Sequence, residues 1–310
     1  MKLPKEVMIA MSQYNLIIIG GGPAGMATAY SASQSGLNKI LLIERLPKLG
    51  GILNQCIHEG FGLHYFKKEL TGTEYSAKYS ALLEGTSIEI LTSSFVTGIS
   101  DNNNVTYINS NGISTVSGRK IVLATGCRER TREMLTIPGT RPSGIYTAGL
   151  SQEMINIYGQ LPGKRVVIVG SGDIGLIMAR RLTLEGSAVI FLLEVRPTLA
   201  GLIRNKIQCL DDFNIPLLCN HELLEVYGKN RVSGIRYRDN TSHQEHYIDC
   251  DTLLFSVGLI PENDLLKATP SSICNGIRLI GNAEYVHGLV DEATKEAEKL
   301  GKEIAKELIL

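Results

Sequence analysis

The chain has 310 residues, and its 31 lysines and arginines balance its 31 aspartates and glutamates, which gives a formal net charge of +0 at pH 7. This balance argues against nucleic-acid binding driven by bulk positive charge and against an electrostatic membrane tether. No apolar run approaches the ~20 residues that a spanning helix needs, and the N-terminus lacks the sustained apolar stretch of a secretory signal. We therefore expect a cytoplasmic protein with no membrane span and with enough residues for two domains.

The first pattern with chemical meaning begins near the N-terminus. Residues 14–19 form an apolar run typical of a buried strand, and the turn G-G-G-P-A-G follows at 20–25. A stretch of small residues at 26–35 fits a helix, and a second apolar run at 40–43 ends at Glu44. The order of strand, glycine turn, helix, strand and acid is typical of a dinucleotide-binding βαβ unit.

The same order returns in the second half of the chain. An apolar run at 166–169 precedes the turn G-S-G-D-I-G at 170–175, a helix extends to about residue 185, and a strand at 188–193 ends at Glu194. The first glycine and the acid have the same spacing in both copies. Because each copy has its strand, its helix and its acid, the sequence predicts two dinucleotide sites in an α/β fold.

Each glycine of the two turns has a physical role. The first permits the tight turn, the second lets the backbone approach a pyrophosphate, and the third lets helix and strand pack closely. The helix N-terminus then faces the phosphates with free N–H groups, and the acid accepts hydrogen bonds from a ribose diol. These glycines are Gly20, Gly22 and Gly25 in the first copy and Gly170, Gly172 and Gly175 in the second.

The first copy resembles the FAD site of the two-dinucleotide-binding flavoprotein superfamily that includes thioredoxin and glutathione reductases. Further segments match that superfamily in order: G-G-I-L-N at 50–54, K-I-V-L-A-T-G at 120–126, D-T-L-L-F-S-V-G-L-I-P at 251–261 and L-I-G-N at 279–282. The resemblance implies two Rossmann-like, three-layer α/β domains, with the NAD domain inserted into the FAD domain. Residues 1–147 and 257–310 would form the FAD domain, and residues 148–256 the NAD domain.

The resemblance also implies which residues hold FAD. Glu44 would bind the adenosine ribose, Arg45 would pack near the adenine, and the backbone of Val96 would meet the adenine edge. Asn282 stands where the family has an aspartate that binds a ribityl hydroxyl, and its amide oxygen could still accept that bond. The residues expected at FAD are Gly20, Gly22, Pro23, Ala24, Gly25, Glu44, Arg45, Gly51, Asn54, Val96, Ala124, Thr125, Gly126, Gly281, Asn282 and Val290.

The acid of the second copy predicts the nicotinamide cofactor. A carboxylate at Glu194 accepts from a free ribose 2′-hydroxyl and repels a 2′-phosphate, so NAD(H) is favoured over NADP(H). Arg196 either softens that preference or is a solvated loop residue. The residues expected at NAD are Gly170, Gly172, Asp173, Ile174, Gly175, Glu194, Arg196 and Gly258.

The redox dithiols of this superfamily are missing from the sequence. Residues 147–156 contain no cysteine, and the segment after the G-G pair supplies only Cys56. Cys56 and Cys127 are either thiols that pack the flavin side without a disulfide or a redox pair, and His287 is either a catalytic residue or a packing residue. No catalytic residue is certain, and the chemistry that remains is hydride transfer between NAD(H) and FAD.

The histidines and the acid of the block at 55–66 fit no standard zinc motif, so we expect no metal. That block, with A-T-G-C-R-E-R-T-R and I-P-G-T-R-P-S-G-I-Y-T-A-G, resembles a subgroup without C-x-x-C that accompanies glycerol-3-phosphate dehydrogenase-like flavoproteins or forms α subunits of opine, proline or cyanide-producing dehydrogenases. The resemblance implies a second flavoprotein or a small redox protein as electron partner, and a homodimer. Arg128, Arg130 and Arg132 form either a docking face or a solvated loop. The alternative function is a flavin subunit with a relay or assembly role that does not oxidise NADH.

Overall fold

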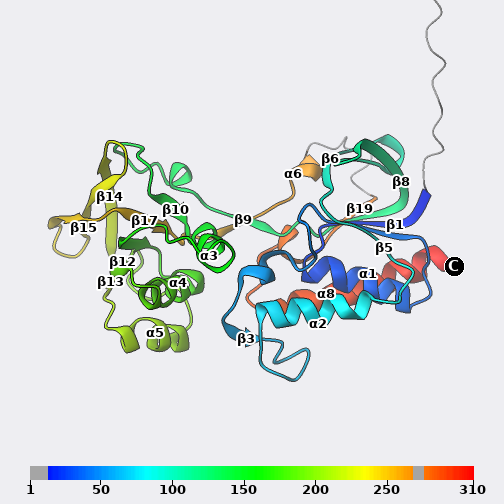
Figure 1. The fold of residues 1–310 in the computed structure, drawn as a ribbon, viewed down its shortest axis with the longest axis horizontal. Helices are drawn as coiled ribbons and strands as arrows, with labels where there is room; N and C mark the ends of the chain where they lie inside the picture. The colour runs from blue at the N-terminus through cyan, green and yellow to red at the C-terminus, as the bar shows by residue number, and fades with distance from the viewer. Residues whose placement is uncertain (1–12, 268–275) are drawn as a thin grey trace, which may run out of the picture. The chain divides into compact units, whose positions relative to one another are not determined.

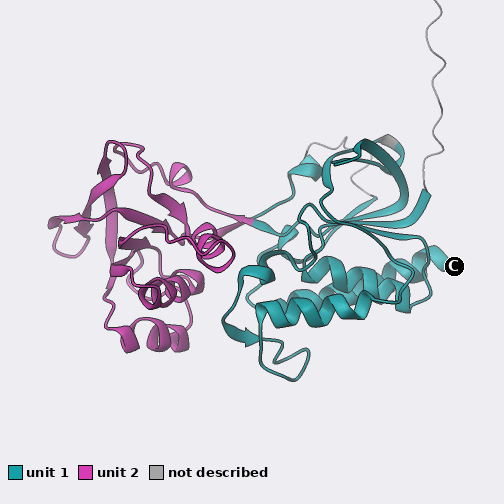
Figure 2. Ribbon diagram, viewed as in Figure 1, with its two compact units in different colours: residues 1–127, 261–310 teal, residues 128–260 magenta. Residues whose placement is uncertain are grey.

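The computed structural model describes residues 13–267 and 276–310. The N-terminal segment considered as a possible secretory signal and Cys274 lie outside the described residues. The chain forms two compact units (Figure 2): unit 1 comprises Met1–Cys127 and Pro261–Leu310, and unit 2 comprises Arg128–Ile260. The second unit is inserted in the sequence of the first, but its boundaries differ from the expected 147/148 and 256/257. Strand β10 (Ile145–Thr147) pairs with β17 (Thr252–Phe255) inside unit 2, so the residues before it belong to unit 2 as well.

Unit 1 is built on a seven-stranded sheet whose order is β5-β2-β1-β8-β7-β6, with β19 beside β8. The pairs β1–β2, β1–β8, β2–β5 and β8–β19 are parallel, whereas β7 runs antiparallel to β6 and β8. The strands are β1 (Gln13–Ile19), β2 (Ile40–Ile43), β5 (Glu89–Leu91), β6 (Phe95–Ser100), β7 (Asn104–Asn109), β8 (Gly112–Leu123) and β19 (Ile277–Leu279).

Alternate residues of β1 face two different cores, which makes unit 1 three-layered. Leu16 and Ile18 pack with helices α1, α2 and α8, whereas Ile17 and Ile19 pack with β6 and β7 on the opposite face. Helices α1 (Pro23–Gln34), α2 (Gly72–Leu83) and α8 (Val290–Ile309) lie together on one side of the sheet (Figure 1). The short α6 (Asp264–Lys267) packs on the opposite core, beside β6. The unit also contains the 3-10 turns η1 (Gly51–Gln55), η2 (Asp101–Asn103) and η5 (Gly281–Ala283), and the hairpin of β3 (Glu59–Phe61) and β4 (Leu70–Thr71).

Small residues let α1 and α8 approach closely. A Cβ added at Gly301 of α8 would collide with the Ser31 side chain of α1 and lies 3.1 Å from the Ala32 nitrogen. The apolar residues that recur along α8 at helical spacing are buried, at Ala293, Ala297, Leu300 and Ile304. This contact holds the N-terminal end of α8 beside the glycine turn that precedes α1.

Unit 2 has a parallel five-stranded sheet of order β10-β17-β11-β12-β13 and a three-stranded antiparallel sheet of order β14-β15-β16. Along β11, Val166 and Ile168 face α4, whereas Val167 faces the antiparallel sheet, so this unit is also three-layered. The remaining elements are η3 (Arg132–Leu135), α3 (Ala148–Asn156), β11 (Arg165–Val169), α4 (Asp173–Leu184), β12 (Ala188–Glu194), α5 (Ile203–Cys209), η4 (Asp211–Phe213), β13 (Leu217–Cys219), β14 (His221–Gly228), β15 (Val232–Asp239) and β16 (Glu245–Asp249).

The chain passes between the units twice, in strands β9 (Cys127–Glu129) and β18 (Leu259–Pro261), which pair with each other. The two-Rossmann α/β architecture expected from the sequence is confirmed. Among the described residues, no helix is both long and apolar enough to span a membrane.

Candidate functional site

The first glycine turn joins β1 to α1 at the carboxyl edge of the sheet in unit 1. Gly20 has a φ of 108°, and its N–H donates to the Ile43 carbonyl at 2.8 Å. A Cβ at Gly20 would collide with the Ala124 carbonyl, and one at Gly25 would collide with the Gly20 carbonyl. Both positions therefore require glycine for the close packing of strand, turn and helix.

The N-terminus of α1 is open to an anion. The residue that precedes the helix, Gly22, makes no side-chain cap, and Pro23 occupies the first helical position. A Cβ at Gly22 would have no heavy atom within 4 Å, so the backbone faces open space there. Uncapped N–H groups beside such a space fit a phosphate-bearing ligand.

The acid at the end of β2 is buried and fixed by the glycine turn. Glu44 is 5% exposed, its Oε2 accepts from the Gly21 N–H at 2.6 Å, and its Oε1 accepts from the Leu46 N–H at 2.7 Å. Each carboxylate oxygen keeps a lone pair for a ribose hydroxyl. The Ser94 N–H donates to the Glu44 carbonyl at 2.9 Å, which brings the segment before Val96 to the same place. Arg45 is exposed.

The loop after Glu44 folds back over the glycine turn. The Gly50 N–H donates to the Gly21 carbonyl at 2.8 Å, and a Cβ at Gly51 would lie 3.2 Å from the Gly22 Cα. The side chain of Asn54 is fixed within the protein, since its Nδ2 donates to the Leu49 carbonyl at 2.9 Å and its Oδ1 accepts from Ser76 at 3.2 Å. The G-G-I-L-N segment and the glycine turn therefore form one local structure.

Two later segments reach the same edge of the sheet. The Ala124 N–H donates to the Ile19 carbonyl at 2.8 Å. The next two residues contact the backbone of Glu262. Thr125 Oγ1 donates to the Glu262 carbonyl, and the Glu262 N–H donates to the Gly126 carbonyl at 2.9 Å. From the C-terminal part, a Cβ at Gly281 would lie 2.8 Å from the Ala24 Cβ of α1. Segments far apart in the sequence thus converge on the first glycine turn.

The sequence predicts that the amide oxygen of Asn282 is available to a ligand, but in the structure this oxygen already accepts a hydrogen bond from the protein. Asn282 Oδ1 accepts from the His287 N–H at 2.9 Å and lies 3.2 Å from His287 Nδ1. Its Nδ2 lies 3.6 Å from Cys127 Sγ. The first residue of α8, Val290, follows this loop and is half-buried.

The second glycine turn repeats the geometry of the first within unit 2. Gly170 has a φ of 97°, and a Cβ there would collide with the Ser256 carbonyl, as a Cβ at Gly20 would collide with Ala124. A Cβ at Gly175 would lie 2.9 Å from the Ser256 Cβ. Gly172 precedes α4 without a side-chain cap, and the nearest atom to its added Cβ is 3.5 Å away.

Glu194 is the counterpart of Glu44 and is also 5% exposed. Its Oε2 accepts from the Ser171 N–H at 3.0 Å and the Ser171 Oγ–H at 2.6 Å, and its Oε1 accepts from the Arg196 N–H at 2.9 Å. The Arg196 side chain is exposed. The repeated fingerprint therefore extends to the hydrogen bonds of the acid.

The repeat extends beyond the acid, which sequence reasoning missed. The Gly201 N–H donates to the Ser171 carbonyl at 2.9 Å, as Gly50 does to Gly21. Asp173 adds to this closure, because its Oδ1 accepts from the Leu202 N–H and from Asn205. The signal was present in the sequence, since P-K-L-G-G at 47–51 and P-T-L-A-G at 197–201 follow the two acids at nearly the same distance.

The carboxyl ends of β10 and β17 complete this edge of unit 2. Thr147, Phe255, Val169 and Leu193 lie in one register row. Beyond that row, the Arg130 N–H donates to the Gly258 carbonyl at 3.0 Å.

A second residue of the connecting strand reaches the same edge. Glu129 Oε1 accepts from the Gly149 N–H, in the first turn of α3, at 2.8 Å. A Cβ at Gly149 would lie 2.6 Å from Glu129 Oε2, so the glycine makes room for this carboxylate. Ile174, also expected at this site, is half-buried in the first turn of α4.

The two cysteines considered for redox roles pack against different elements. Cys56 is buried, and a Cβ added at Gly72 would lie 2.6 Å from the Cys56 Cβ. This burial raises the pKa of the Cys56 thiol to about 12. Cys127 is half-buried beside Asn282. No disulfide links the cysteines that the structure describes. At neutral pH Cys56 is a protonated thiol and a poor nucleophile.

One of the three arginines considered for a docking face is not available for it. Arg132 is 2% exposed, and its guanidinium donates to the carbonyls of Thr140 at 2.6 Å, Pro138 at 2.8 Å and Ile137 at 3.2 Å. The docking hypothesis is therefore wrong for Arg132, because the side chain fixes the loop that follows η3.

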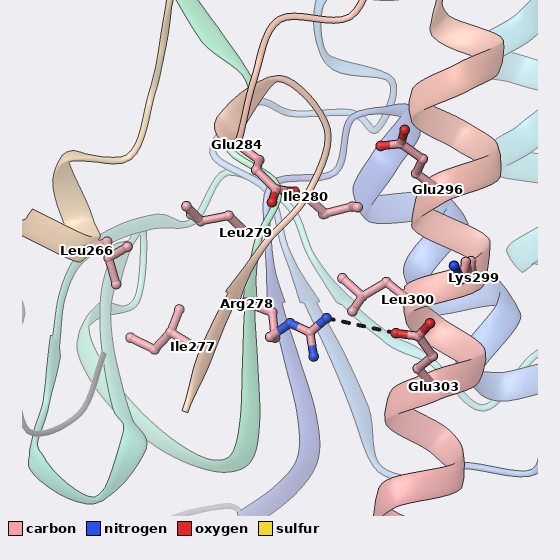
Figure 3. A pocket seen from close by; sticks show the side chains of 10 residues that line it. All are labelled: Leu266, Ile277, Arg278, Leu279, Ile280, Glu284, Glu296, Lys299, Leu300 and Glu303. Carbon is pink, nitrogen blue, oxygen red and sulfur yellow. Dashed lines mark ion pairs between the residues drawn. The ribbon is translucent and has the colours of Figure 1, made fainter. Parts of the chain in front are cut away.

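A cavity of about 350 Å³ lies in unit 1 between β19, η5 and α8 (Figure 3). Ile277, Leu279 and Leu300 supply apolar lining, and charged groups surround them, with Arg278 paired to Glu303 at 3.8 Å. No residue of either glycine turn lines it. The cavity is thus separate from the two candidate sites.

Comparison with known proteins gives a family model, described as pyridine nucleotide-disulphide oxidoreductase, that matches residues 14–279. The F subunit of alkyl hydroperoxide reductase from Staphylococcus aureus strain MRSA252 is 26% identical over 258 residues, which are 82% of this chain and 48% of that protein. Its counterpart from Pseudomonas putida is 24% identical over 274 residues, covering 85% and 49%. The chain spans about half the length of these curated relatives.

Solved structures share the fold. A thioredoxin reductase of T. acidophilum has a TM-score of 0.77 at 20% identity, covering 96% of this chain and 99% of that one. A bacillithiol disulfide reductase of Bacillus cereus has a TM-score of 0.72 at 17% identity, covering 96% and 100%. An L-proline dehydrogenase chain of P. horikoshii has a TM-score of 0.66 at 20% identity, covering 96% and 56%.

Proposed function

This chain belongs to the pyridine nucleotide-disulphide oxidoreductase family, whose members are flavin-dependent oxidoreductases that use pyridine nucleotides. From that premise we propose that it oxidises NADH through bound FAD and passes the electrons to a separate redox partner. The observation that carries the proposal is the duplicated arrangement of glycine turn, open helix N-terminus and buried acid, present once in each unit.

Unit 1 is the proposed FAD site. The open N-terminus of α1 and the space beside Gly22 suit the pyrophosphate, and Glu44 keeps acceptor capacity for the adenosine ribose. Gly51 and Gly281 pack against the same turn, so the segments expected near the flavin surround it. The open helix end, the buried acid and the converging segments together support FAD binding at this turn.

Unit 2 is the proposed NADH site. Both oxygens of Glu194 are engaged by backbone N–H groups, and the side chain is buried, so the carboxylate cannot turn away from a ribose 2′-substituent. A 2′-phosphate there would meet a fixed negative charge, whereas a 2′-hydroxyl can donate to it. This fixed carboxylate supports NADH over NADPH.

When bound, FAD would supply the redox chemistry as acceptor of a hydride equivalent from the reduced nicotinamide. The chain's own residues then bind and orient the two dinucleotides. No side-chain acid or base is needed for this transfer, and Cys56 is unsuited to a thiolate mechanism because burial raises its pKa to about 12.

The partner is proposed as a second flavoprotein or a small redox protein. The sequence contains no C-x-x-C pair that could store two electrons within this chain. The curated relatives are named as a subunit of alkyl hydroperoxide reductase, so they act together with another protein. This supports electron transfer between separate proteins.

The test is anaerobic stopped-flow reduction of the flavin-loaded protein by NADH and, separately, by NADPH, followed by flavin absorbance. We expect fast bleaching by NADH and at least ~10-fold slower bleaching by NADPH, the effect of roughly 1.4 kcal/mol of repulsion. Equal rates would overturn the cofactor preference. If neither nucleotide bleaches a flavin that dithionite does reduce, the protein is instead a flavin subunit with a relay or assembly role.

A further inference from the structure

A hydrogen-bonded network in unit 1 joins the loop after η5 to α8. It consists of Asn282, Tyr285, His287 and Glu296, and is called the His287 network below. His287 Nε2 lies 2.9 Å from Glu296 Oε2, Tyr285 donates to Glu296 Oε1 at 2.5 Å, and the Tyr285 and His287 rings stack at 4.2 Å. The His287 side chain is only 3% exposed. Figure 3 shows Glu296 on α8, where it lines the cavity.

The network fixes which end of the Asn282 amide is available. The His287 backbone N–H can only donate, so the amide oxygen must be the atom that faces it, at 2.9 Å. The same oxygen lies 3.2 Å from His287 Nδ1. An amide oxygen has two lone pairs, and His287 occupies both when Nδ1 carries a proton.

A hydrogen bond between His287 and the Asn282 oxygen needs the hydrogen on Nδ1, because an amide oxygen can only accept. Nδ1 faces the Asn282 oxygen, and Nε2 faces the Glu296 carboxylate, which comes from α8. Both ring nitrogens therefore face oxygen atoms of neighbouring side chains. The Asn282 oxygen is thus saturated from within the protein.

The amide nitrogen of Asn282 makes one weak hydrogen bond and can donate another. Among the described residues its one hydrogen-bond partner is Cys127 Sγ, at 3.6 Å, and sulfur is a weak acceptor. Asn282 directly follows Gly281, which packs against the first glycine turn. An amide nitrogen that is held there by the His287 network and has only sulfur as its acceptor fits a hydroxylated ligand that can accept from it.

We propose that His287 is a positioning residue of the flavin site, which saturates the oxygen of Asn282 and so makes Asn282 a hydrogen-bond donor to the ribityl hydroxyls of FAD. The inference rests on the proposed function of unit 1 and deepens it. Where an aspartate would accept a hydrogen bond from the ribityl chain, this chain donates one, and the polarity of the contact is reversed.

The test uses two variants that each preserve one half of the imidazole. In H287N the amide can replace Nδ1–H toward Asn282, whereas in H287Q it can replace Nε2–H toward Glu296 and leaves the Asn282 oxygen without the ring donor. Both lose the ring stack with Tyr285. The readout is the dissociation constant of FAD, measured by fluorescence quenching on apoprotein prepared from the full chain.

We expect H287N to bind FAD within about 3-fold of the wild type and H287Q to bind it ~10-fold more weakly, the loss of one well-placed hydrogen bond. N282D, which has no N–H to donate, should also bind FAD ~10-fold more weakly. Equal affinities of H287N and H287Q would overturn the positioning role, and wild-type affinity of N282D would overturn the donor assignment. If the wild-type apoprotein binds no FAD, the proposed function itself fails, which is distinct from either result.

Discussion

Replacing Arg132 by methionine should destabilise unit 2 without affecting a docking surface. The side chain is 2% exposed and holds the loop after η3 through the carbonyls of Ile137, Pro138 and Thr140. Methionine keeps much of the length and apolar volume of the side chain and removes every donor. The three carbonyls then lose a charged partner at once.

The magnitude follows from these bonds. Hydrogen bonds from a charged donor contribute about 1.5–3 kcal/mol each, and the low end applies here because Pro138 and Thr140 are exposed enough for water to replace the donor. The two short bonds and the longer one then sum to about 4 kcal/mol. Arg132 Nε is buried without a hydrogen bond in the structure, and removing it returns about 1 kcal/mol. We expect a net loss of about 3 kcal/mol, or roughly 10 °C in the melting temperature of a unit of this size.

Differential scanning calorimetry of the full chain measures this loss, with Arg130→Met as the matched control because Arg130 is exposed. The control should melt within about 1 °C of the wild type. An unchanged melting temperature for Arg132→Met would refute the reasoning and would return Arg132 to the list of candidate docking residues.

Gly20→Ala should abolish FAD retention, whereas Gly170→Ala should retain FAD and lose reduction by NADH. The reason is that each added Cβ collides with a backbone carbonyl, at a φ of 108° for Gly20 and 97° for Gly170. Absorbance of the purified variants and stopped-flow reduction measure the two effects, and a Gly170→Ala variant purified without FAD would contradict the prediction. Because burial raises the pKa of Cys56 to about 12, the native thiol should resist iodoacetamide at pH 8. For the same reason the folded state should lose stability as the pH rises from 9.0 toward 12. Rapid labelling of the native protein, seen by mass spectrometry, would disprove the burial argument. Gly149→Ala should displace the Glu129 carboxylate, whose Oε2 would lie 2.6 Å from the new Cβ, and should lower the melting temperature; a Gly149→Ala variant as stable as the wild type would show that the contact is easily relaxed.

The local geometry of both turns was predictable because the determinants are close in sequence. Within 25 residues the glycines specify the turn, the apolar runs specify the strands, and the acid follows at the strand end. The extension of the repeat through the loop after each acid was also written in the sequence, in P-x-L-x-G, but its meaning became clear only when Gly50 and Gly201 were seen to bond back to the turn.

The long-range contacts were not predictable from local pattern. Arg132 and the two neighbouring arginines at 128 and 130 look alike in sequence, and only the fold of the following loop buries one of them. Similarly, the orientation of the Asn282 amide depends on a histidine five residues later and a glutamate on α8. Side-chain polarity of this kind is decided by the partners that the fold supplies.

The pairing of β9 with β18 brings the two ends of unit 2 together, so that unit 2 can be replaced as a whole. The Arg130 N–H and the Gly258 carbonyl are 3.0 Å apart, so the inserted segment begins and ends at neighbouring points. A stretch whose two ends adjoin can be excised and the remaining chain rejoined through a short turn of glycine and serine. Grafting a foreign segment with adjoining ends in place of unit 2 would then test its proposed role in nucleotide specificity and leave the sequence of unit 1 untouched.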